Sequence, residues 1–228
     1  MSEVKPHEYK NLYWVTLKDG NIRLATLNAD KGYRVYTERL IKIGDKEYRT
    51  FDPNKSKLGA AIWKGLKTFP FNEKTKILYL GAASGTTVSH ISDIIGDTGQ
   101  IFAVEFSPRS IRDLVTIAER RKNIYPILAD ARFPEQYATF VPLVDIVYED
   151  VAQPSQAEIL NQNVQTFLKK GGYFFLAVKA RSIDVVENPT VIFKKVEKEL
   201  MDYGLKILEI IDIEPYEKDH VMIVGQKI

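Results

Sequence analysis

The stretch KILYLGAASGTT, residues 76–87, carries a short apolar run into Gly81, passes through small residues to Gly85, and continues into two threonines. An apolar run followed by a glycine loop is typical of a buried strand that turns into a helix. In a doubly wound α/β sheet, ligands bind at the carboxyl ends of the strands, beside the first strand. This loop is therefore where a bound cofactor is expected.

Strand-like and helix-like segments alternate after residue 76. The apolar runs predict strands at 76–80, 101–105, 124–128, 143–149 and 172–179, and the intervening segments predict helices at 87–95, 108–120, 155–168 and 189–201. Nearly continuous apolar strands are typical of a parallel sheet covered on both faces. The last two apolar runs, 205–213 and 220–226, are joined by six residues, which are too few for a crossover helix, so the last strand is expected to be antiparallel.

The N-terminal part has a different pattern. Short β-rich runs at 12–17, 22–27 and 39–43 are separated by Asp-Gly, Asn-rich and Gly-Asp turns, which indicate hairpins. A helical stripe follows in DPNKSKLGAAIWKGL, residues 52–66, with start signals at Asp52, Pro53 and Asn54. We predict a small antiparallel β domain over 1–52 and a Rossmann-like α/β domain over 53–228.

Composition limits the class of protein. The 228 residues include no cysteine and only three histidines, which argues against disulfides and a structural metal site. Neither a membrane span nor a secretory signal is evident, so we expect a cytoplasmic protein with no membrane partner. Residues 1–70 carry a net charge of +6 and the remainder −4. A basic N-terminal part suits an anionic partner such as RNA. A solvated surface rich in lysine explains this charge distribution about equally well.

The glycine loop favours a nucleoside cofactor over a dinucleotide. It lacks the middle glycine of G-x-G-x-x-G, and no Gly-Lys-Ser/Thr follows, so S-adenosylmethionine is the best candidate. Glu105 ends the second strand, where it can accept the ribose hydroxyls, and Phe106 can pack on adenine. Asp130 and Ala131 follow the third strand and can bind the adenine edge. Taken singly, Glu105 and Asp130 are well explained as loop caps, but the glycine loop and both acids together, each at a strand end, favour a cofactor site.

Several longer motifs are specific. EDVAQP (149–154), KARSID (179–184) and EPYEKDHVMIVG (214–225), together with LGAASGTTVSH (80–90), closely resemble fibrillarin, the RNA 2'-O-methyltransferase of box C/D guide ribonucleoproteins. The resemblance runs from about residue 10 to the C-terminus. Eukaryotic members carry a Gly/Arg-rich arm that this chain lacks, so it is similar to the shorter archaeal form.

The resemblance implies a catalytic Lys-Asp-Lys-His set. Asp150, Lys179 and His220 match it, and Lys57 is favoured as the first lysine, with Lys55 as its close alternative. We expect Asp150 to position Lys179 as the base, whereas a structural ion pair is the competing interpretation. His90 lies within a predicted helix and is interpreted as a packing or surface residue. The expected cofactor-binding residues are Gly81, Ala82, Gly85, Thr86, Thr87, Glu105, Phe106, Asp130, Ala131, Asp150, Val151, Ala152 and Gln153.

The implied function is 2'-O-methylation of rRNA, and of tRNA as a further substrate, at sites chosen by a guide RNA. The implied partners are box C/D guide RNA, target RNA, a Nop-domain scaffold protein and, indirectly, a kink-turn-binding ribosomal-type protein. The N-terminal tyrosines (Tyr9, Tyr13, Tyr33, Tyr36 and Tyr48) are candidates for scaffold docking, and ordinary packing explains them as well. A small-molecule O-methyltransferase and a non-catalytic assembly subunit remain the alternatives.

Overall fold

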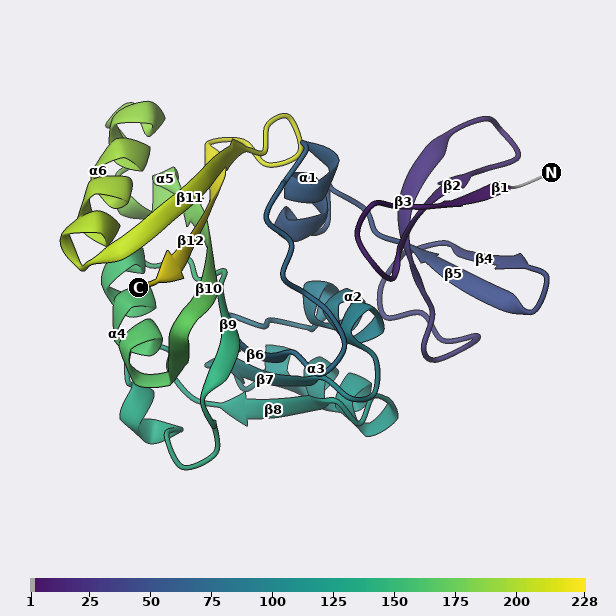
Figure 1. The fold of residues 1–228 in the computed structure, drawn as a ribbon, viewed down its shortest axis with the longest axis horizontal. Coiled ribbons are helices and arrows are strands. Elements are labelled where there is room, and N and C mark those ends of the chain that lie inside the picture. The colour runs from purple at the N-terminus through teal and green to yellow at the C-terminus, as the bar shows by residue number, and fades with distance from the viewer. Residues whose placement is uncertain (1–2) are drawn as a thin grey trace.

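The computed structural model describes residues 3–228 and contains two sheets (Figure 1). The first has the order β1-β2-β3-β5-β4 and is antiparallel throughout. Its strands are β1 (Glu3–Pro6), β2 (Leu12–Thr16), β3 (Ile22–Leu27), β4 (Leu40–Ile43) and β5 (Lys46–Thr50). The three runs predicted as strands are β2, β3 and β4. Strands β1 and β5 were not predicted.

The second sheet has seven strands in the order β11-β12-β10-β9-β6-β7-β8. Its strands are β6 (Lys76–Leu80), β7 (Gln100–Glu105), β8 (Ile124–Leu128), β9 (Val144–Glu149), β10 (Leu168–Lys179), β11 (Leu205–Asp212) and β12 (His220–Lys227). Strands β10, β9, β6, β7 and β8 are parallel, whereas β12 is antiparallel to both of its neighbours. The prediction of a mostly parallel sheet with an antiparallel last strand is confirmed.

Helices cover both faces of the large sheet (Figure 1). Side chains of α1 (Lys57–Trp63), α2 (Thr86–Ile95) and α3 (Ser110–Arg120) pack on one face. Side chains of α4 (Gln156–Phe167), α5 (Ala180–Ile183) and α6 (Pro189–Asp202) pack on the other, and a short 3-10 turn lies at Pro134–Gln136. Burial of apolar side chains on both faces contributes about 25 cal/mol per Å² of apolar surface removed from water, and it explains the continuous apolar strands.

Helix α1 begins later than its predicted start signals. The Ser56 hydroxyl caps it by accepting a hydrogen bond from the Gly59 amide at 3.3 Å. Asp52 instead stabilises the preceding turn, where its carboxylate accepts the Asn54 amide at 2.9 Å. This cap places Lys57 in the first turn of the helix.

A buried polar network joins the small sheet to the large one. Arg49 of β5 donates to Asp93 of α2 and to Glu38, each at 2.9 Å, and Arg121 donates to Asp93 at 2.6 Å. His90 is also buried, and burial together with the charges of Arg49 and Arg121 holds its pKa well below the ordinary value of 6.5. His90 is therefore a packing residue. The domain boundary at residue 52 stays a prediction.

The N-terminal tyrosines also pack. Tyr9 stacks on Phe69, Tyr13 meets Tyr48 edge to face, and Arg120 lies over the Tyr33 ring at 4.3 Å. The hydroxyl of Tyr36 bonds to Nε2 of His90 at 2.8 Å. These contacts favour the packing interpretation, and scaffold docking by the tyrosines stays a prediction.

Candidate active site

The loop after β6 packs directly on the end of β9. Gly81 has φ +80, and a Cβ at this position would collide with the Asp150 carbonyl oxygen and lie 3.1 Å from Val151. The Gly81 and Ala82 amides both donate to the Val104 carbonyl at 3.0 Å. Only glycine combines this conformation with so close an approach. The loop is thereby fixed at the carboxyl end of the sheet.

Gly85 has a different neighbour. A Cβ here would lie 2.8 Å from Ile117 and 3.0 Å from Leu114, so Gly85 allows α3 to pack on the start of α2. Thr87 is buried, and its hydroxyl pairs with the Ser56 hydroxyl at 2.9 Å. Ala82, Gly85, Thr86 and Thr87 do not line the adjoining pocket. Contact with a cofactor stays a prediction for these four residues and for the predicted residues that line it.

A pocket of about 500 Å³ opens at the carboxyl ends of β6, β7, β8 and β9. The predicted cofactor residues that line it are Gly81, Glu105, Phe106, Asp130, Ala131, Asp150, Val151, Ala152 and Gln153. The lining residues that we did not predict are Ala83, Val104, Ser107, Ser110, Ala129, Arg132 and Ile159. Four loops distant in sequence thus converge on one hollow, as expected for a nucleoside site in this class of sheet.

Glu105 is fixed on two sides. Its Oε2 accepts the Ala83 amide and its Oε1 accepts the Ser107 amide, each at 2.8 Å. The residue is only 5% exposed, yet it lines the pocket. A carboxylate has about four lone-pair positions, so both oxygens keep capacity for ribose hydroxyls. The loop-cap interpretation and the ribose interpretation are therefore compatible. Phe106, by contrast, is 68% exposed and presents its ring at the pocket.

Asp130 has an unpredicted partner. Arg132 Nη2 donates to Asp130 Oδ2 at 2.6 Å and Nε donates to the same oxygen at 3.0 Å. These hydrogen bonds lower the pKa of Asp130, so the charged carboxylate is favoured. No signal in the sequence pointed to Arg132, because its contact with Asp130 depends on the direction in which its side chain turns, back toward the residue two positions earlier.

The four candidate catalytic residues lie at the same edge. Asp150, Lys179 and His220 come from the neighbouring strands β9, β10 and β12, and Lys179 and His220 are directly paired in register. Lys57 Nζ lies 2.9 Å from Asp150 Oδ1 and 3.0 Å from Oδ2. Lys55 is exposed. The structure therefore brings Lys57, rather than Lys55, to Asp150.

One expected pairing is corrected. We expected Asp150 to contact Lys179, but its ion-pair partner is Lys57. Within residues 3–228, no hydrogen bond or ion pair engages the Lys179 ammonium nitrogen, although the Lys179 backbone bonds to Gln156. The physical reason is the late start of α1, which aims Lys57 at the end of β9. The Lys179 ammonium therefore keeps its hydrogen-bond donors for a ligand.

The tautomer of His220 follows from its partner. Nδ1 lies 2.6 Å from the Lys218 carbonyl, which can only accept, so Nδ1 carries the proton. In the neutral ring Nε2 is then an acceptor.

Beneath this edge, Glu149 is fully buried, and burial with the nearby Asp150 raises its pKa well above 4.5. Burial therefore favours the neutral form of this carboxyl group behind Asp150.

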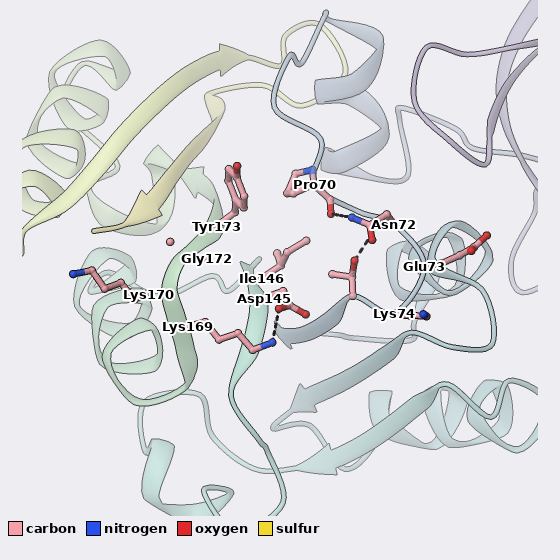
Figure 2. A pocket seen from close by; sticks show the side chains of 12 residues that line it. Pro70, Asn72, Glu73, Lys74, Asp145, Ile146, Lys169, Lys170, Gly172 and Tyr173 are labelled. Carbon is pink, nitrogen blue, oxygen red and sulfur yellow. Dashed lines mark hydrogen bonds and ion pairs between the residues drawn. The ribbon is translucent and has the colours of Figure 1, made fainter.

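A second pocket lies at the opposite edge of the sheet (Figure 2). Figure 2 shows Lys169 paired with Asp145 and the Asn72 side chain bonded to Pro70. The Asn72 amide also donates to the Thr75 hydroxyl at 3.1 Å. None of the candidate site residues lines it. In the part of the chain described, no cluster of three potential metal ligands occurs, and no helix is long and apolar enough to cross a membrane.

The sheet topology and the nucleoside pocket define a Rossmann-like S-adenosylmethionine-dependent methyltransferase. A family model described as fibrillarin matches residues 4–228. The fibrillarin-like rRNA/tRNA 2'-O-methyltransferase of Pyrococcus horikoshii is 54% identical over 227 residues and is covered completely, as is this chain. The chain belongs to the fibrillarin family.

Two solved structures are informative. Aeropyrum pernix fibrillarin in complex with natively bound S-adenosyl-L-methionine has a TM-score of 0.92 and 50% identity, covering 98% of this chain and 97% of that one. The fibrillarin of a fibrillarin/Nop5p complex has a TM-score of 0.86 and 40% identity, covering 98% and 100%. Thus one similar chain binds S-adenosylmethionine and another assembles with Nop5p.

Proposed function

We propose that this chain transfers the methyl group of S-adenosylmethionine to a ribose 2'-hydroxyl of rRNA or tRNA, at sites chosen by a box C/D guide RNA. The observation that carries the proposal is the position of Asp150. It lines the nucleoside pocket and also pairs with Lys57, so it joins the cofactor side to the cluster of Lys57, Lys179 and His220. Membership in a family whose members are named rRNA/tRNA 2'-O-methyltransferases supports the choice of acceptor.

The pocket residues suit the cofactor. Glu105 faces the hollow with a fixed carboxylate for ribose hydroxyls, Phe106 supplies an exposed ring for adenine, and Asp130 supplies an anionic acceptor for the adenine amino group. When bound, S-adenosylmethionine supplies an electrophilic methyl group on a positive sulfonium. The protein then has to orient the acceptor, and correct alignment alone is worth roughly 7–11 kcal/mol of barrier.

The proposed catalytic roles are those that the family resemblance implies, and the common position of these residues at one edge of the sheet supports them. As the C–O bond forms and the S–CH₃ bond breaks, Lys179, acting in its neutral amine form, accepts the proton of the 2'-hydroxyl on Nζ, a role typically worth about 10²–10⁴-fold in rate. Lys57 and His220 hold the ribose and its phosphate. The 2'-hydroxyl explains the choice of RNA over DNA.

The partners are part of the proposal. The chain contains no recognised RNA-reading module, so the guide RNA selects the nucleotide. A Nop-domain scaffold protein carries the guide, in line with the fibrillarin/Nop5p complex, and a kink-turn-binding ribosomal-type protein joins indirectly. We propose that this methylation takes place in the cytoplasm, where rRNA and tRNA are processed in an archaeal-type cell.

Tritiated methyl transfer onto a guide-matched RNA, with and without the scaffold protein, tests this function. We expect labelled RNA only in the assembled complex. Label on small molecules instead would favour a small-molecule O-methyltransferase, and label on neither would favour a non-catalytic subunit.

Lys179→Ala tests the proposed base within the same assay. It should abolish turnover and leave S-adenosylmethionine affinity nearly intact by isothermal titration, because Lys179 does not line the pocket. Lys170→Ala is the matched control, since Lys170 is exposed on the same strand near the opposite edge. Parallel loss of binding and turnover in Lys179→Ala would sink the assignment.

A further inference from the structure

Arg181 connects three segments at the catalytic edge. It lies in α5, two residues after Lys179, and its Nε donates to Asp219 Oδ2 at 2.9 Å. Its Nη1 donates to the carbonyls of Val185 and Glu187 at 2.9 and 3.1 Å. A planar guanidinium presents several donors in a fixed fork, so one side chain holds both the loop after α5 and the turn before β12.

Asp219 is the residue that aims His220. It has φ +57, a left-handed conformation that is uncommon for residues other than glycine, and it directly precedes His220. Its carbonyl accepts the Ala180 amide at 3.1 Å, and its amide donates to Glu214 at 3.1 Å. Such a conformation persists only when surrounding contacts hold it. The Arg181 ion pair is the contact among them that the Asp219 side chain makes, with side chains 38% and 15% exposed.

The direction of this turn also sets the chemistry of His220. The bond from Nδ1 to the Lys218 carbonyl spans Asp219, so it forms only while the turn keeps its shape. That bond leaves Nε2 as the acceptor. A change at Asp219 would therefore alter both the direction of the ring and the nitrogen that carries its proton.

We propose that Arg181 is a positioning residue for the methyl-transfer reaction, acting through Asp219 to fix the orientation and the Nδ1–H tautomer of His220. The inference rests on the proposed function for its kinetic consequence. Its structural consequence concerns the free protein alone, so the two can fail separately.

Imidazole ¹⁵N–¹H spectra of the free protein provide the first test. The chain has only His7, His90 and His220, so the three rings can be assigned by single substitutions. In Arg181→Gln and in Asp219→Asn, we expect the His220 signals to move from the Nδ1–H pattern toward a mixture of tautomers. The His7 and His90 signals should stay in place. Unchanged His220 signals in both variants would overturn the proposal.

Methyl transfer in the assembled complex provides the second test. We expect Arg181→Gln to lower kcat about 10- to 100-fold, as a displaced catalytic group does, and to change the KM for RNA less than about threefold. Arg181→Lys should restore part of kcat, because an ammonium reaches Asp219 but cannot replace the fork. The positioning role of Arg181 would be contradicted if Arg181→Lys lost as much kcat as Arg181→Gln and if KM changed as much as kcat in both variants.

Arg120→Gln is the matched control. Arg120, the last residue of α3, also pairs with an aspartate of another segment, Asp30 after β3, at 2.9 Å, with side chains 45% and 18% exposed. Helix α3 packs on β8, at the other end of the sheet order from β12 and His220. Arg120→Gln should leave the His220 signals and kcat unchanged. An equal loss in this control would assign the effect of Arg181 to general stability. Absence of methyl transfer in the wild-type complex would instead count against the proposed function and leave the spectra to decide the role of Arg181.

Discussion

Lys57 and Asp150, separated by 93 residues, form a two-oxygen ion pair at the carboxyl edge of the sheet, with distances of 2.9 and 3.0 Å. The pair joins the first turn of α1 to the end of β9. Their side chains are 19% and 23% exposed, so the contact is partly shielded from solvent. Lys57→Ala should lower kcat by about 10²-fold, since a small displacement of a catalytic group has that effect.

Lys55→Ala is the matched control for this prediction. Lys55 lies two residues earlier, before the helix, and is exposed. Single-turnover methyl transfer with both variants provides the measurement. Full activity in Lys57→Ala together with a loss in Lys55→Ala would reverse the assignment of the first lysine.

Gly81→Ala should damage the cofactor site directly. The new Cβ would meet the Asp150 carbonyl and the Val151 side chain, so the loop or the end of β9 has to move. Overpacking of this kind costs about 1–3 kcal/mol, and we expect the Kd for S-adenosylmethionine to rise at least about tenfold, equivalent to about 1.4 kcal/mol.

Gly96→Ala separates backbone strain from this collision. Gly96 has φ +63, and no atom lies within 4 Å of the position that a Cβ would take. Its substitution by alanine therefore introduces backbone strain without a steric collision. Thermal unfolding and titration of both variants should show a smaller loss of stability and unchanged binding in Gly96→Ala. Equal effects in the two variants would mean that the contact of Gly81 with Asp150 is unimportant.

Glu149→Gln should stabilise the protein at high pH. Burial and Asp150 raise the pKa of Glu149 well above 4.5, and neither carboxyl oxygen has a hydrogen-bond partner. The folded state thus binds this proton more tightly than the unfolded chain. The associated stability is fully present below about pH 4.5 and is lost as the pH rises through the folded pKa.

A glutamine of the same shape has no proton to lose. The free energy of unfolding of Glu149→Gln, relative to wild type, should therefore increase by about 1.4 kcal/mol per pH unit from about pH 4.5 up to the folded pKa of Glu149, and stay level above it. Urea unfolding at a series of pH values from about 4.5 upward measures it, with the exposed Glu119→Gln as control. A difference that stays constant with pH would rule out a neutral Glu149.

Much of the site could be predicted because parallel strands end at a common edge. Glu105, Asp130, Asp150 and Lys179 each follow an apolar run, and the structure places all four at that edge. Partners that depend on side-chain direction could not be predicted. Arg132 folds back on Asp130, and the ion pair from Lys57 depends on Ser56, not Asp52, capping α1.

Strands β5 and β1 of the small sheet were not predicted for a similar reason. The sequence of β5, KEYRT, looks like a solvated segment because of its charges. Arg49 is nevertheless fully buried, since Glu38 and Asp93 supply oxygens to its guanidinium from elsewhere in the chain. Burial of a paired charge leaves no periodic apolar signal. Strand β1, EVKP, is short, exposed and ends at a proline, so its pattern is equally weak.

The most direct measurement uses two guide-matched target RNAs in the assembled complex, one fully ribose and one with a single 2'-deoxynucleotide at the selected position. If the chain methylates a ribose 2'-hydroxyl, tritium from labelled S-adenosylmethionine will enter the first RNA and not the second, because the second lacks the acceptor oxygen. Equal label on both RNAs would place the methyl group elsewhere on the nucleotide and contradict the account.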